Sequence, residues 1–451
     1  MIDFTPSEEQ QLIIETVRGF AGNEIRERAR ECDESGKLPD DVLAHLHELG
    51  LVANALPEAQ GGGGERSAVT GVLAKYDVVI LDVGQSVIHD HLSLGILVGL
   101  PETGGVLEPL QAELLALDEP GLRIKFEPVS ELEYAEWVSH QGKPRHIVTL
   151  LARCIDAEQI ARVTAVTAEQ GLNIDRISRL SGRIPLDRLN QTGKACIELS
   201  VRGTGRDIAQ YRKGLLELAA EMNVDIAYQE DTVFRRHRRL VVFDMDSTLV
   251  EGEVIDELAK EAGVGDQVAA ITARAMAGEL DFQESFRQRV AMLKGLSVNA
   301  LEAVHNRLTL TEGTEKLVST LQSLGYNTAI LSGGFTYFGE RIRRQLGIDH
   351  VYANELDIED GVVTGRVKGA VVDGQRKAEL LEQLAHRYNI SLEQTVAVGD
   401  GANDLPMLGI AGLGIAYRAK PLVRASAKQA LSNIGLDGIL YLMGIRDRDT
   451  L

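Results

Sequence analysis

Two aspartates, Asp244 and Asp246, stand one residue apart directly after the apolar run Leu240–Phe243. Four apolar residues in succession predict a short strand that is buried on both faces, as in a parallel sheet. Two carboxylates at the end of a buried strand disfavour each other's ionisation unless a divalent cation or a proton relieves the repulsion. The pattern therefore indicates a metal-assisted site in which one carboxylate attacks and the other transfers protons. Taken alone, Asp-x-Asp is more often part of a solvated turn, so the assignment depends on the rest of the chain.

Further polar residues follow two predicted strands and lie on one predicted helix later in the chain. The strand 328–331 ends in Ser332–Gly334 (SGG), the strand 395–398 ends in Gly399–Asp404 (GDGAND), and Lys377 lies on a helix between them. Strands that alternate with helices form a parallel sheet with helices on both faces. Ligands bind such sheets at the carboxyl ends of the strands, so we expect these residues to share one site with the two aspartates.

Together, Asp244–Thr248 (DMDST), Ser332–Gly334, Lys377 and Gly399–Asp404 resemble the motifs of the haloacid dehalogenase superfamily of phosphotransferases. Within that superfamily, residues 239–448 closely resemble the phosphoserine phosphatases. Further similarity extends through Val250–Glu253, Phe282–Arg287 and Thr311–Gly313. The resemblance implies an α/β fold, with a Rossmann-like doubly wound parallel sheet.

Residues of about 253–312 read as helical, rich in Ala, Glu and Leu and without a strand pattern. A helical insert directly after a catalytic strand is expected to be a cap that excludes water from the site. The resemblance implies that this domain hydrolyses O-phospho-L-serine to L-serine and phosphate through an aspartyl-phosphate intermediate. That reaction is the final step of L-serine biosynthesis.

The resemblance assigns roles to the carboxylates. Asp244 is the expected nucleophile, and Asp246 is expected to protonate the departing serine oxygen and then to take a proton from the attacking water. Mg²⁺ is the expected cofactor, because it prefers oxygen ligands. Asp244, the backbone carbonyl of Asp246 and Asp400 are its expected ligands, with Asp404 in support.

The remaining site residues are expected to bind the substrate. Ser332, the Gly333 amide and Lys377 would hold the phosphoryl oxygens, and Asn403 would complete the phosphate or water network. Phosphoserine also carries an ammonium and a carboxylate, which require an acidic residue and an arginine. Glu253 and Arg287 match the positions of the family's substrate-binding pair.

Two apolar cap residues, Met276 and Phe282, match positions that cover the substrate, although each is equally compatible with plain core. Arg287 taken alone is compatible with an exposed helix position, and Glu253 with a surface charge. The basic run Phe234–Arg239 before the catalytic strand is expected to be a solvated linker helix.

Composition restricts the class of protein. The chain has 451 residues, 44% hydrophobic and 25% charged, which predicts about three soluble domains. The formal net charge of −20 argues against a nucleic-acid partner or an anionic membrane surface. The start of the chain lacks a secretory signal, and Cys32, Cys154 and Cys196 are scattered without metal-ligand spacing. We expect a cytoplasmic protein with reduced thiols and no membrane segment.

An internal repeat with an offset of 94 residues precedes the catalytic part. The second copy, 143–232, predicts the order βαββαβ, which is ferredoxin-like and resembles the ACT domains, small amino-acid-sensing modules. The first copy, 51–142, lacks its first strand and its ligand loop, and its last strand is expected at 121–129. Our hypothesis is that Leu51–Leu56 fills the missing strand position. An amino-acid effector such as serine and a homodimer are expected by analogy.

Residues 1–50 predict two helices, and a glycine run, 61–64, follows as a linker. The first 60 residues or so resemble the N-terminus of acyl-CoA dehydrogenases, but nothing further along matches that family's flavin site or catalytic glutamate. The segment is either an acquired helical appendage or an artefact of fusion or start-site choice, and it carries no activity over.

Three alternatives remain open at this point. The chain could be another small-molecule phosphatase of the same superfamily, or chiefly an ACT-type amino-acid-binding regulator. The complete set of catalytic residues argues against the regulator. A flavin dehydrogenase is favoured only by residues 1–60.

Overall fold

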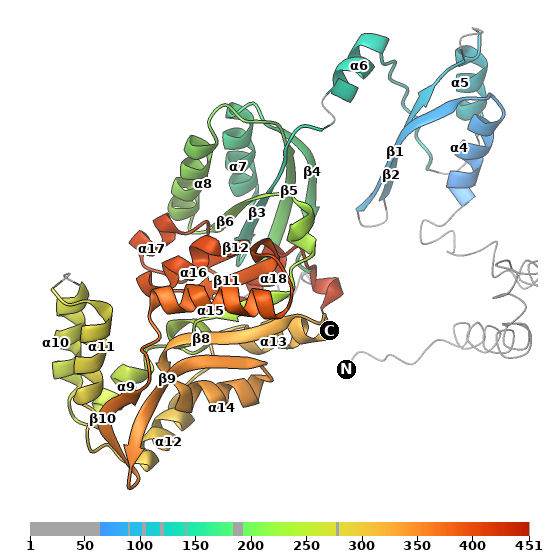
Figure 1. The fold of residues 1–451 in the computed structure, drawn as a ribbon. Helices are drawn as coiled ribbons and strands as arrows, with labels where there is room; N and C mark the ends of the chain where they lie inside the picture. The colour runs from blue at the N-terminus through green and yellow to red at the C-terminus, as the bar shows by residue number, and fades with distance from the viewer. Residues whose placement is uncertain are drawn as a thin grey trace, which may run out of the picture. The chain divides into compact units, whose positions relative to one another are not determined.

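The computed structural model describes residues 64–88, 91–101, 105–117, 121–139, 142–183, 193–276 and 279–450 (Figure 1). Of residues 64–68 and of Met276, it describes the backbone alone. The helices predicted within 1–50, the strand proposed at 51–56 and most of the glycine run lie outside the described residues. The chain divides into two compact units, Met1–Glu131 and Leu132–Leu451.

The described part of the first unit contains two helices and a β-hairpin. Its elements are α4 (Gly64–Ala74), β1 (Val79–Ile88), β2 (His91–Gly99) and α5 (Leu107–Leu115), and the two strands pair antiparallel. A small core joins the helices through the side chains of Val72, Leu73, Leu110 and Leu114. Large apolar residues of β1, such as Val79, Val83 and Ile88, remain exposed.

The strand predicted at 121–129 is not formed. Leu122, Ile124 and Phe126 are half-buried and alternate with exposed residues, as in a strand that covers one face. In the second copy the last strand pairs with the first one, β3 (Arg145–Ala152). The offset of 94 places the counterpart of β3 at residues 51–58, which lie outside the described part of the chain. A strand requires a hydrogen-bonded neighbour, so the alternation in sequence was not a sufficient signal.

The second copy has the predicted ferredoxin-like order. After β3 come α7 (Ala157–Glu169), β4 (Asn173–Arg179), β5 (Ala195–Arg202), α8 (Ile208–Met222) and β6 (Asp225–Glu230). They form an antiparallel sheet in the order β4-β5-β3-β6. Subtracting 94 from the bounds of α7 and β4 gives 63–75 and 79–85, which match α4 and the start of β1. The later elements do not keep this offset, because β5 and α8 shifted back by 94 fall at 101–108 and 114–128, whereas β2 and α5 lie at 91–99 and 107–115.

The catalytic part contains a seven-stranded sheet. Its strands are β7 (Leu240–Phe243), β8 (Asn327–Phe335), β9 (His350–Glu359), β10 (Val362–Lys368), β11 (Thr395–Gly399), β12 (Leu413–Tyr417) and β13 (Gln429–Leu431). The order is β10-β9-β8-β7-β11-β12-β13, and every pair is parallel except the β9–β10 hairpin. The strand before the two aspartates is central, as its continuous apolar run predicted.

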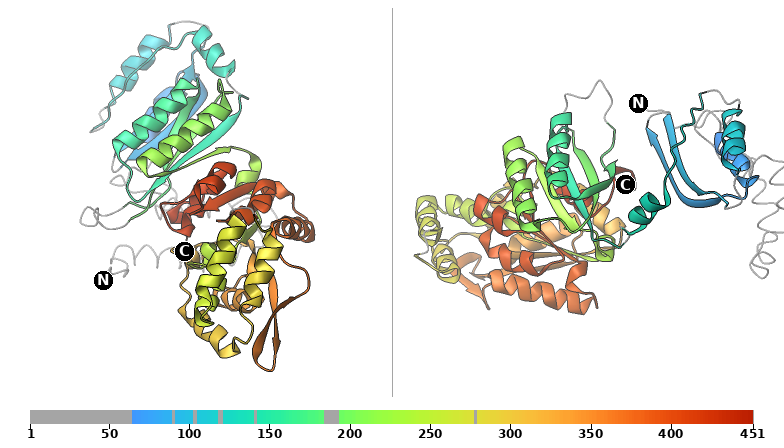
Figure 2. Two further views of the ribbon diagram at one scale, coloured as in Figure 1. Left: turned by 90° about the vertical axis from the view of Figure 1, so that its left-hand side faces the viewer. Right: turned by 90° about the horizontal axis from the view of Figure 1, so that it is seen from above.

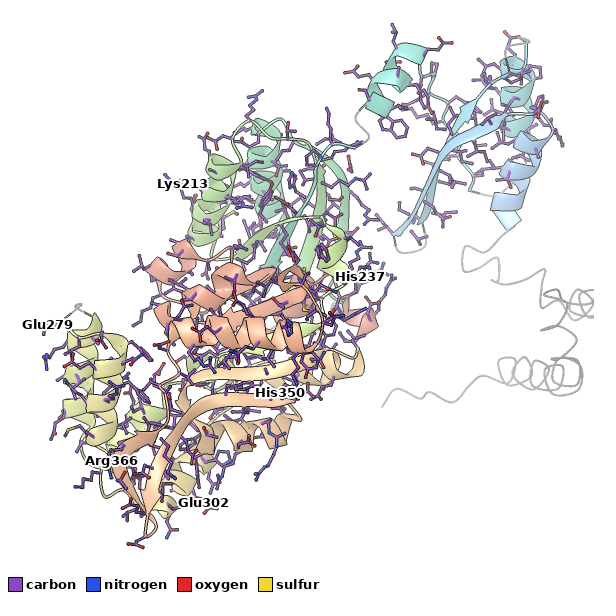
Figure 3. The ribbon with its side chains drawn as sticks, viewed as in Figure 1. Lys213, His237, Glu279, Glu302, His350 and Arg366 are labelled. Carbon is purple, nitrogen blue, oxygen red and sulfur yellow. The ribbon has the colours of Figure 1, made fainter. Side chains whose placement is uncertain are left out.

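Successive residues of β7 point to opposite faces of the sheet. Leu240 and Val242 join a core with α15 (Gly374–Arg387) and α16 (Leu405–Ile410). Val241 and Phe243 join the opposite core, with α13 (Thr314–Ser323), α14 (Thr336–Leu346) and α18 (Ile439–Leu442). Figure 3 shows the side chains that fill these layers. The sheet is thus covered on both faces, as expected for a doubly wound α/β fold. The short helix α17 (Pro421–Ser426) connects β12 to β13.

Four helices between β7 and β8 form the cap. They are α9 (Val254–Glu261), α10 (Gly265–Met276), α11 (Phe282–Ala291) and α12 (Val298–Arg307). The chain leaves the sheet at Val250 and returns at Leu310, and these two residues form an antiparallel bridge. Helices α9, α10 and α11 lie together beside the sheet (Figures 1 and 2).

The segment between the two modules of the second unit was predicted incorrectly. A short 3₁₀ turn, Val233–Arg236, precedes β7, and Arg235 and Arg238 are buried within it and after it. Arg235 donates to Glu198 of β5 at 2.5 Å, and Arg238 donates to Gln229 of β6. Arg235 can be buried because the buried acid Glu198 pairs with it. Glu198 is distant in sequence, so the local charge pattern did not predict the pairing.

Candidate active site

Asp244 begins directly where β7 ends. Its backbone N–H donates to Val398 O of the neighbouring β11 at 2.8 Å, which continues the parallel ladder by one bond. Its carboxylate accepts from Met245 N–H at 2.7 Å and pairs with Lys377 Nζ at 2.9 Å. The side chain is only 5% exposed, so it is oriented by the sheet, by its own backbone and by one buried cation.

Asp246 lies on the irregular loop 245–249, in which Ser247 takes a left-handed φ of +55°. The Asp246 carboxylate is buried, and Val254 N–H at the start of α9 donates to it at 3.1 Å. A Cβ on Gly334 would lie 2.5 Å from Asp246 Oδ2, so no larger residue fits at 334. Asp246 therefore lies against both the start of the cap and the Gly334 segment of β8.

Lys377 enters the site from α15. Asp373 caps this helix by accepting from Arg376 N–H at 2.9 Å. The Lys377 ammonium is fully buried and contacts Asp404 at 2.7 Å in addition to Asp244. Burial alone would lower the pKa of Lys377, but Asp244 and Asp404 raise it above its ordinary value. The lysine is consequently a permanent cation at this position.

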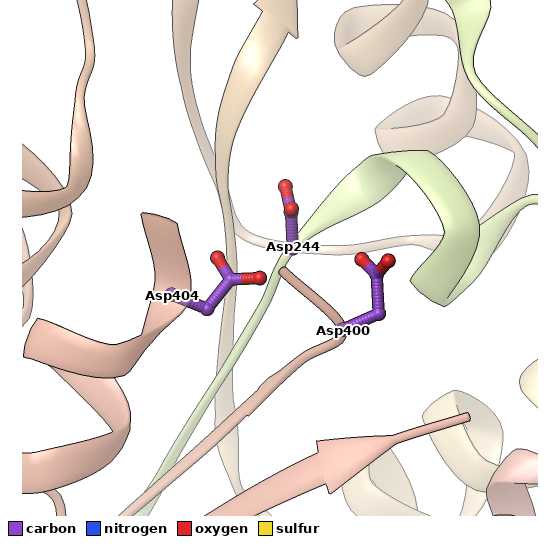
Figure 4. Close-up of side chains that lie close together, drawn as sticks. All are labelled: Asp244, Asp400 and Asp404. Atoms are coloured by element: carbon purple, nitrogen blue, oxygen red, sulfur yellow. The ribbon is translucent and has the colours of Figure 1, made fainter. Parts of the chain in front are cut away.

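Asp400 and Asp404 come from the turn after β11. One carboxylate oxygen from each of Asp244, Asp400 and Asp404 can be chosen so that all three lie within 4.8 Å of one another (Figure 4). Gly401 N–H orients Asp404 by donating to it at 2.9 Å. The amide of Asn403 lies beside Gly333, 4.0 Å from the position that a Cβ there would take. The predicted motifs are therefore brought to one edge of the sheet.

The carboxylates exceed the positive charge that contacts them. Burial, followed by the charge of Asp404, raises the pKa of Asp244 above its ordinary value. Burial, followed by Asp244 and Asp404, raises the pKa of Asp400 to about 8. Burial, followed by Glu253 and Asp244, raises the pKa of Asp246 well above its ordinary value. An all-oxygen donor set with this excess of negative charge fits a hard divalent cation.

The cap residues predicted to read the substrate occupy different environments. Glu253 precedes α9, accepts from Ser247 Oγ at 3.0 Å and acts electrostatically on Asp246. Phe282 Cζ would lie 3.3 Å from a Cβ on Gly333, so the cap covers the Ser332–Gly334 segment of β8. Arg287 is exposed on α11, where it donates to Gln283 at 3.3 Å. It lines a surface hollow of about 770 Å³ together with Phe282 and Asp373.

Arg289, which the motif comparison passed over, is placed differently from Arg287. Its side chain is largely buried, and its Nε has no hydrogen-bond partner among the residues that the structure describes. Burial lowers the pKa of Arg289, while the negative charges of Glu253, Asp256 and Asp246 offset part of that effect. Helical phase could have identified it, because residue 289 is seven positions after Phe282 and shares its face, whereas residue 287 does not.

Two histidines, His350 and His305, do not belong to the cluster of site carboxylates. His350, labelled in Figure 3, begins β9 and contacts the Tyr388 hydroxyl at 2.6 Å. His305 lies on α12 and contacts the ring of Phe338. His350 is accounted for by its hydrogen bond, whereas the buried Nδ1 of His305 has no hydrogen-bond partner among the described residues. Within the described residues, no helix has the length and apolarity needed to cross a bilayer.

Comparison with known families gives three matches along the chain. Residues 238–412 match the haloacid dehalogenase-like hydrolases, and residues 144–229 match an ACT domain. Residues 7–97 match the acyl-CoA dehydrogenase N-terminal domain. The predicted resemblances are confirmed, and the third reaches well beyond the 60 residues expected, overlapping α4, β1 and β2.

Relatives match most of the chain. The phosphoserine phosphatase SerB2 of Mycobacterium tuberculosis is 42% identical over 85% of this chain and 90% of its own length. A phosphoserine phosphatase of Streptomyces coelicolor is 41% identical with the same two coverages. A solved haloacid dehalogenase family hydrolase of Salmonella enterica superposes with a TM-score of 0.57 at 31% identity, covering 67% of this chain and 99% of that one. A probable phosphoserine phosphatase from Vibrio cholerae gives 0.53 at 34% identity, covering 66% and 86%.

The sheet topology, the carboxylates gathered after β7 and β11, the buried lysine and the length of these matches agree with one another. The chain belongs to the phosphoserine phosphatase family of haloacid dehalogenase-like hydrolases.

Proposed function

We propose that the protein hydrolyses O-phospho-L-serine to L-serine and phosphate, the final step of L-serine biosynthesis. The observation that carries the proposal is the buried Asp244 carboxylate, held between Lys377 and two further aspartates at the carboxyl edge of the sheet. The relatives at 41–42% identity are named phosphoserine phosphatases, which supports this substrate.

Asp244 is the proposed nucleophile. Its carboxylate oxygen attacks phosphorus, the bond to the serine oxygen breaks, and an aspartyl-phosphate forms. The ammonium of Lys377, the Ser332 hydroxyl and the Gly333 amide would neutralise and orient the phosphoryl oxygens. Because Lys377 already contacts Asp244, its charge is placed where negative charge develops.

Asp246 is the proposed general acid and base. Burial, followed by Glu253 and Asp244, raises its pKa, which favours the protonated carboxyl, and that proton goes to the departing serine oxygen. The resulting carboxylate then takes a proton from the water that attacks the aspartyl-phosphate. The second half-reaction therefore restores both aspartates.

Mg²⁺ is the proposed cofactor, held by Asp244, the backbone carbonyl of Asp246 and Asp400, with Asp404 as an outer support. When bound, the ion supplies a fixed positive charge for phosphoryl oxygens and for the crowded carboxylates. The cluster of three carboxylates, of which Asp244 and Asp404 are buried and pair with Lys377, supports this proposal.

Glu253 and an arginine of α11 are proposed to read the amino-acid part of the substrate. Glu253 suits the ammonium group, since it is an acid beside Asp246. Arg287 is the arginine predicted from the motif, but we propose that Arg289 binds the carboxylate. It is the arginine that is buried next to Glu253 and lacks a partner for its Nε in the described chain.

The modules ahead of the catalytic domain are proposed to be regulatory. We place the boundaries at 1–50, 51–142, 143–232 and 239–448. An amino acid such as serine is the proposed effector of the ACT domain, and a homodimer in the cytoplasm is the proposed assembly. Calorimetric titration with L-serine and sedimentation of the full chain test the first two proposals.

Substrate comparison tests the main proposal. Phosphate release is measured with phosphoserine, phosphothreonine and a panel of sugar phosphates at equal concentrations. Phosphoserine should give a kcat/KM at least about tenfold higher than any sugar phosphate, because sugar phosphates lack the ammonium and the carboxylate, whereas phosphothreonine keeps both and differs by one methyl group. A higher kcat/KM for a sugar phosphate would show that the chain is a different phosphatase of this superfamily.

A further inference from the structure

We propose that Asn354 is a positioning residue of the active site, which fixes the Ser332–Gly334 loop relative to the helix that carries Lys377. This inference rests on the proposed function, since it concerns groups assigned to the phosphoryl oxygens. Asn354 lies on β9 and belongs to none of the motifs that identified the site.

The side chain of Asn354 is 2% exposed and uses both ends of its amide. Its Nδ2 donates to Gly333 O at 2.8 Å, and its Oδ1 accepts from Val372 N–H at 2.8 Å. An amide has one donating and one accepting end, so this orientation is the one that satisfies both partners. One buried side chain therefore bridges two loops that come from different parts of the sheet.

The first of these loops is a break in the β8–β9 ladder. Leu331 pairs with Tyr352 and Phe335 pairs with Asn354, so four steps along β8 correspond to two steps along β9. The additional residues bulge out of the strand, and they include Ser332 and Gly333, which are assigned to the phosphoryl group. The Asn354 side chain supplies a hydrogen bond at the point where the ladder cannot.

The peptide unit between Gly333 and Gly334 is held at both ends. Asn354 binds its carbonyl, and its N–H donates to Ser332 Oγ at 2.9 Å. Ser332 Oγ thus accepts one hydrogen bond from the loop, and its own proton is free to be donated to a phosphoryl oxygen. Two consecutive glycines have wide conformational freedom, so the loop would sample other orientations without this restraint.

The second loop begins the helix of Lys377. Val372 precedes Asp373, which caps α15, and Lys377 N–H donates to Asp373 O at 2.9 Å. A shift of Val372 would therefore move the first turn of α15 and the lysine with it. The Asn354 amide therefore sets the distance from the Ser332 hydroxyl and the Gly333 N–H to the ammonium of Lys377.

The test compares Asn354→Leu and Asn354→Asp with a control at the other end of the same strand pair. Thr328 of β8 is fully buried and donates to Asp349 Oδ2, just before β9, at 3.0 Å. Thr328→Val removes a buried hydrogen bond between the same two strands but lies at their amino ends. Each variant is assayed for kcat and KM with phosphoserine, for inhibition by inorganic phosphate and for Tm.

We expect Asn354→Leu to lower kcat by about ten- to hundredfold and to weaken inhibition by phosphate, as loss of a supporting partner does at other sites. Thr328→Val should keep kcat within about twofold, although its Tm falls as well. Asn354→Asp retains the acceptor and, when protonated, the donor. Its kcat relative to the unmodified protein should therefore rise as the pH is lowered.

Equal kcat values for Asn354→Leu, Asn354→Asp and Thr328→Val would overturn the proposal and leave Asn354 a structural residue. If Asn354→Leu does not fold, Asn354→Asp alone tests the proposal. Its kcat is divided by that of the unmodified protein at each pH, and a ratio that does not change with pH contradicts the proposal. Failure of the unmodified protein to hydrolyse phosphoserine would contradict the proposed function instead. The same variants would then be compared on whichever phosphate ester it does cleave.

Discussion

The catalytic edge and the seam between the ACT domain and the phosphatase sheet both bury polar groups, but the hydrogen bonds of Asp225 and Gln429 in the seam are satisfied within the protein. In the seam, Asp225 accepts from Ser432 N–H and Asn433 N–H, each at 2.8 Å, and from Asn433 Nδ2 at 3.2 Å. Gln429 accepts from Tyr228 N–H at 3.0 Å and donates to Tyr228 O. At the catalytic edge, Asp244, Asp400 and Asp404 lie close together, and the ammonium of Lys377 pairs with Asp244 and Asp404.

The difference separates structural from functional burial of polar groups. A buried group whose hydrogen bonds are satisfied within the protein stabilises one arrangement of the chain. A buried group that lacks a partner raises the free energy of the folded state unless a ligand completes it. By this criterion Asp225 and Gln429 are structural, whereas the proposed function supplies a cation to Asp400 and a carboxylate to Arg289.

Asp244→Asn should have the largest effect. The amide keeps the shape of the side chain but is a poor nucleophile, so kcat for phosphoserine should fall by about four orders of magnitude or more. The variant should fold, because it removes one of the crowded negative charges. Phosphate release and thermal denaturation check both statements, and retention of a tenth of the activity would remove Asp244 from its assigned role.

Arg289→Ala and Arg287→Ala sharpen the comparison within one helix. Loss of a charge-assisted hydrogen bond to the substrate carboxylate costs about 2–3 kcal/mol, so Arg289→Ala should raise KM for phosphoserine by roughly thirty- to hundredfold. Arg287→Ala should change KM by less than about threefold, because its guanidinium is solvated. Phosphoethanolamine, which lacks the carboxylate, should be affected little by either variant. A larger effect of Arg287→Ala would restore the assignment made from the motif.

Asp225→Ala tests the other side of the comparison. It leaves two buried backbone N–H groups unpaired, so the free energy of unfolding should fall by about 2–4 kcal/mol while KM for phosphoserine is unchanged. Asp175→Ala is the control, since Asp175 pairs with Arg202 in the same module but is partly exposed. Its effect should stay below about 1 kcal/mol in urea denaturation. Equal losses for the two variants would refute the structural importance of the seam.

The effect of pH on metal binding should be smaller but of definite sign. The pKa of Asp400 is raised to about 8 in the folded chain, whereas an aspartate in the unfolded chain has its ordinary pKa of 3.8. Without metal, the folded state therefore binds more protons than the unfolded one, and its stability falls as pH rises through this range. Because Mg²⁺ favours the ionised carboxylates, the increase in Tm that it produces should grow between pH 6 and pH 9. A decrease with pH would contradict the proposed cluster.

Sequence patterns located the catalytic edge because its chemistry follows directly from strand ends. Asp244, Asp400 and Asp404 come together because β7 and β11 are parallel neighbours, and a short apolar run predicts such strands well. The proposal for Arg289 in place of Arg287 depends on helical phase, which motif spacing does not register. Asn354 carries no motif, since its partners are backbone groups of residues distant in sequence.

Predictions that depended on remote partners were the ones that failed. The segment 121–129 has the alternation of a strand but forms none. The run Phe234–Arg239 has the charge of a solvated linker, yet Arg235 is buried against Glu198. Local composition cannot report a pairing that is created only when the ACT domain packs on the phosphatase sheet.

Trapping of the covalent intermediate tests the account most directly. The protein is mixed with phosphoserine, quenched in acid within milliseconds, and the peptide that contains residues 240–250 is analysed by mass spectrometry. The account predicts one added phosphoryl group on Asp244, absent from Asp244→Asn and lost on treatment with hydroxylamine. Turnover without any phosphorylated peptide, or with the phosphoryl group on another residue, would contradict it.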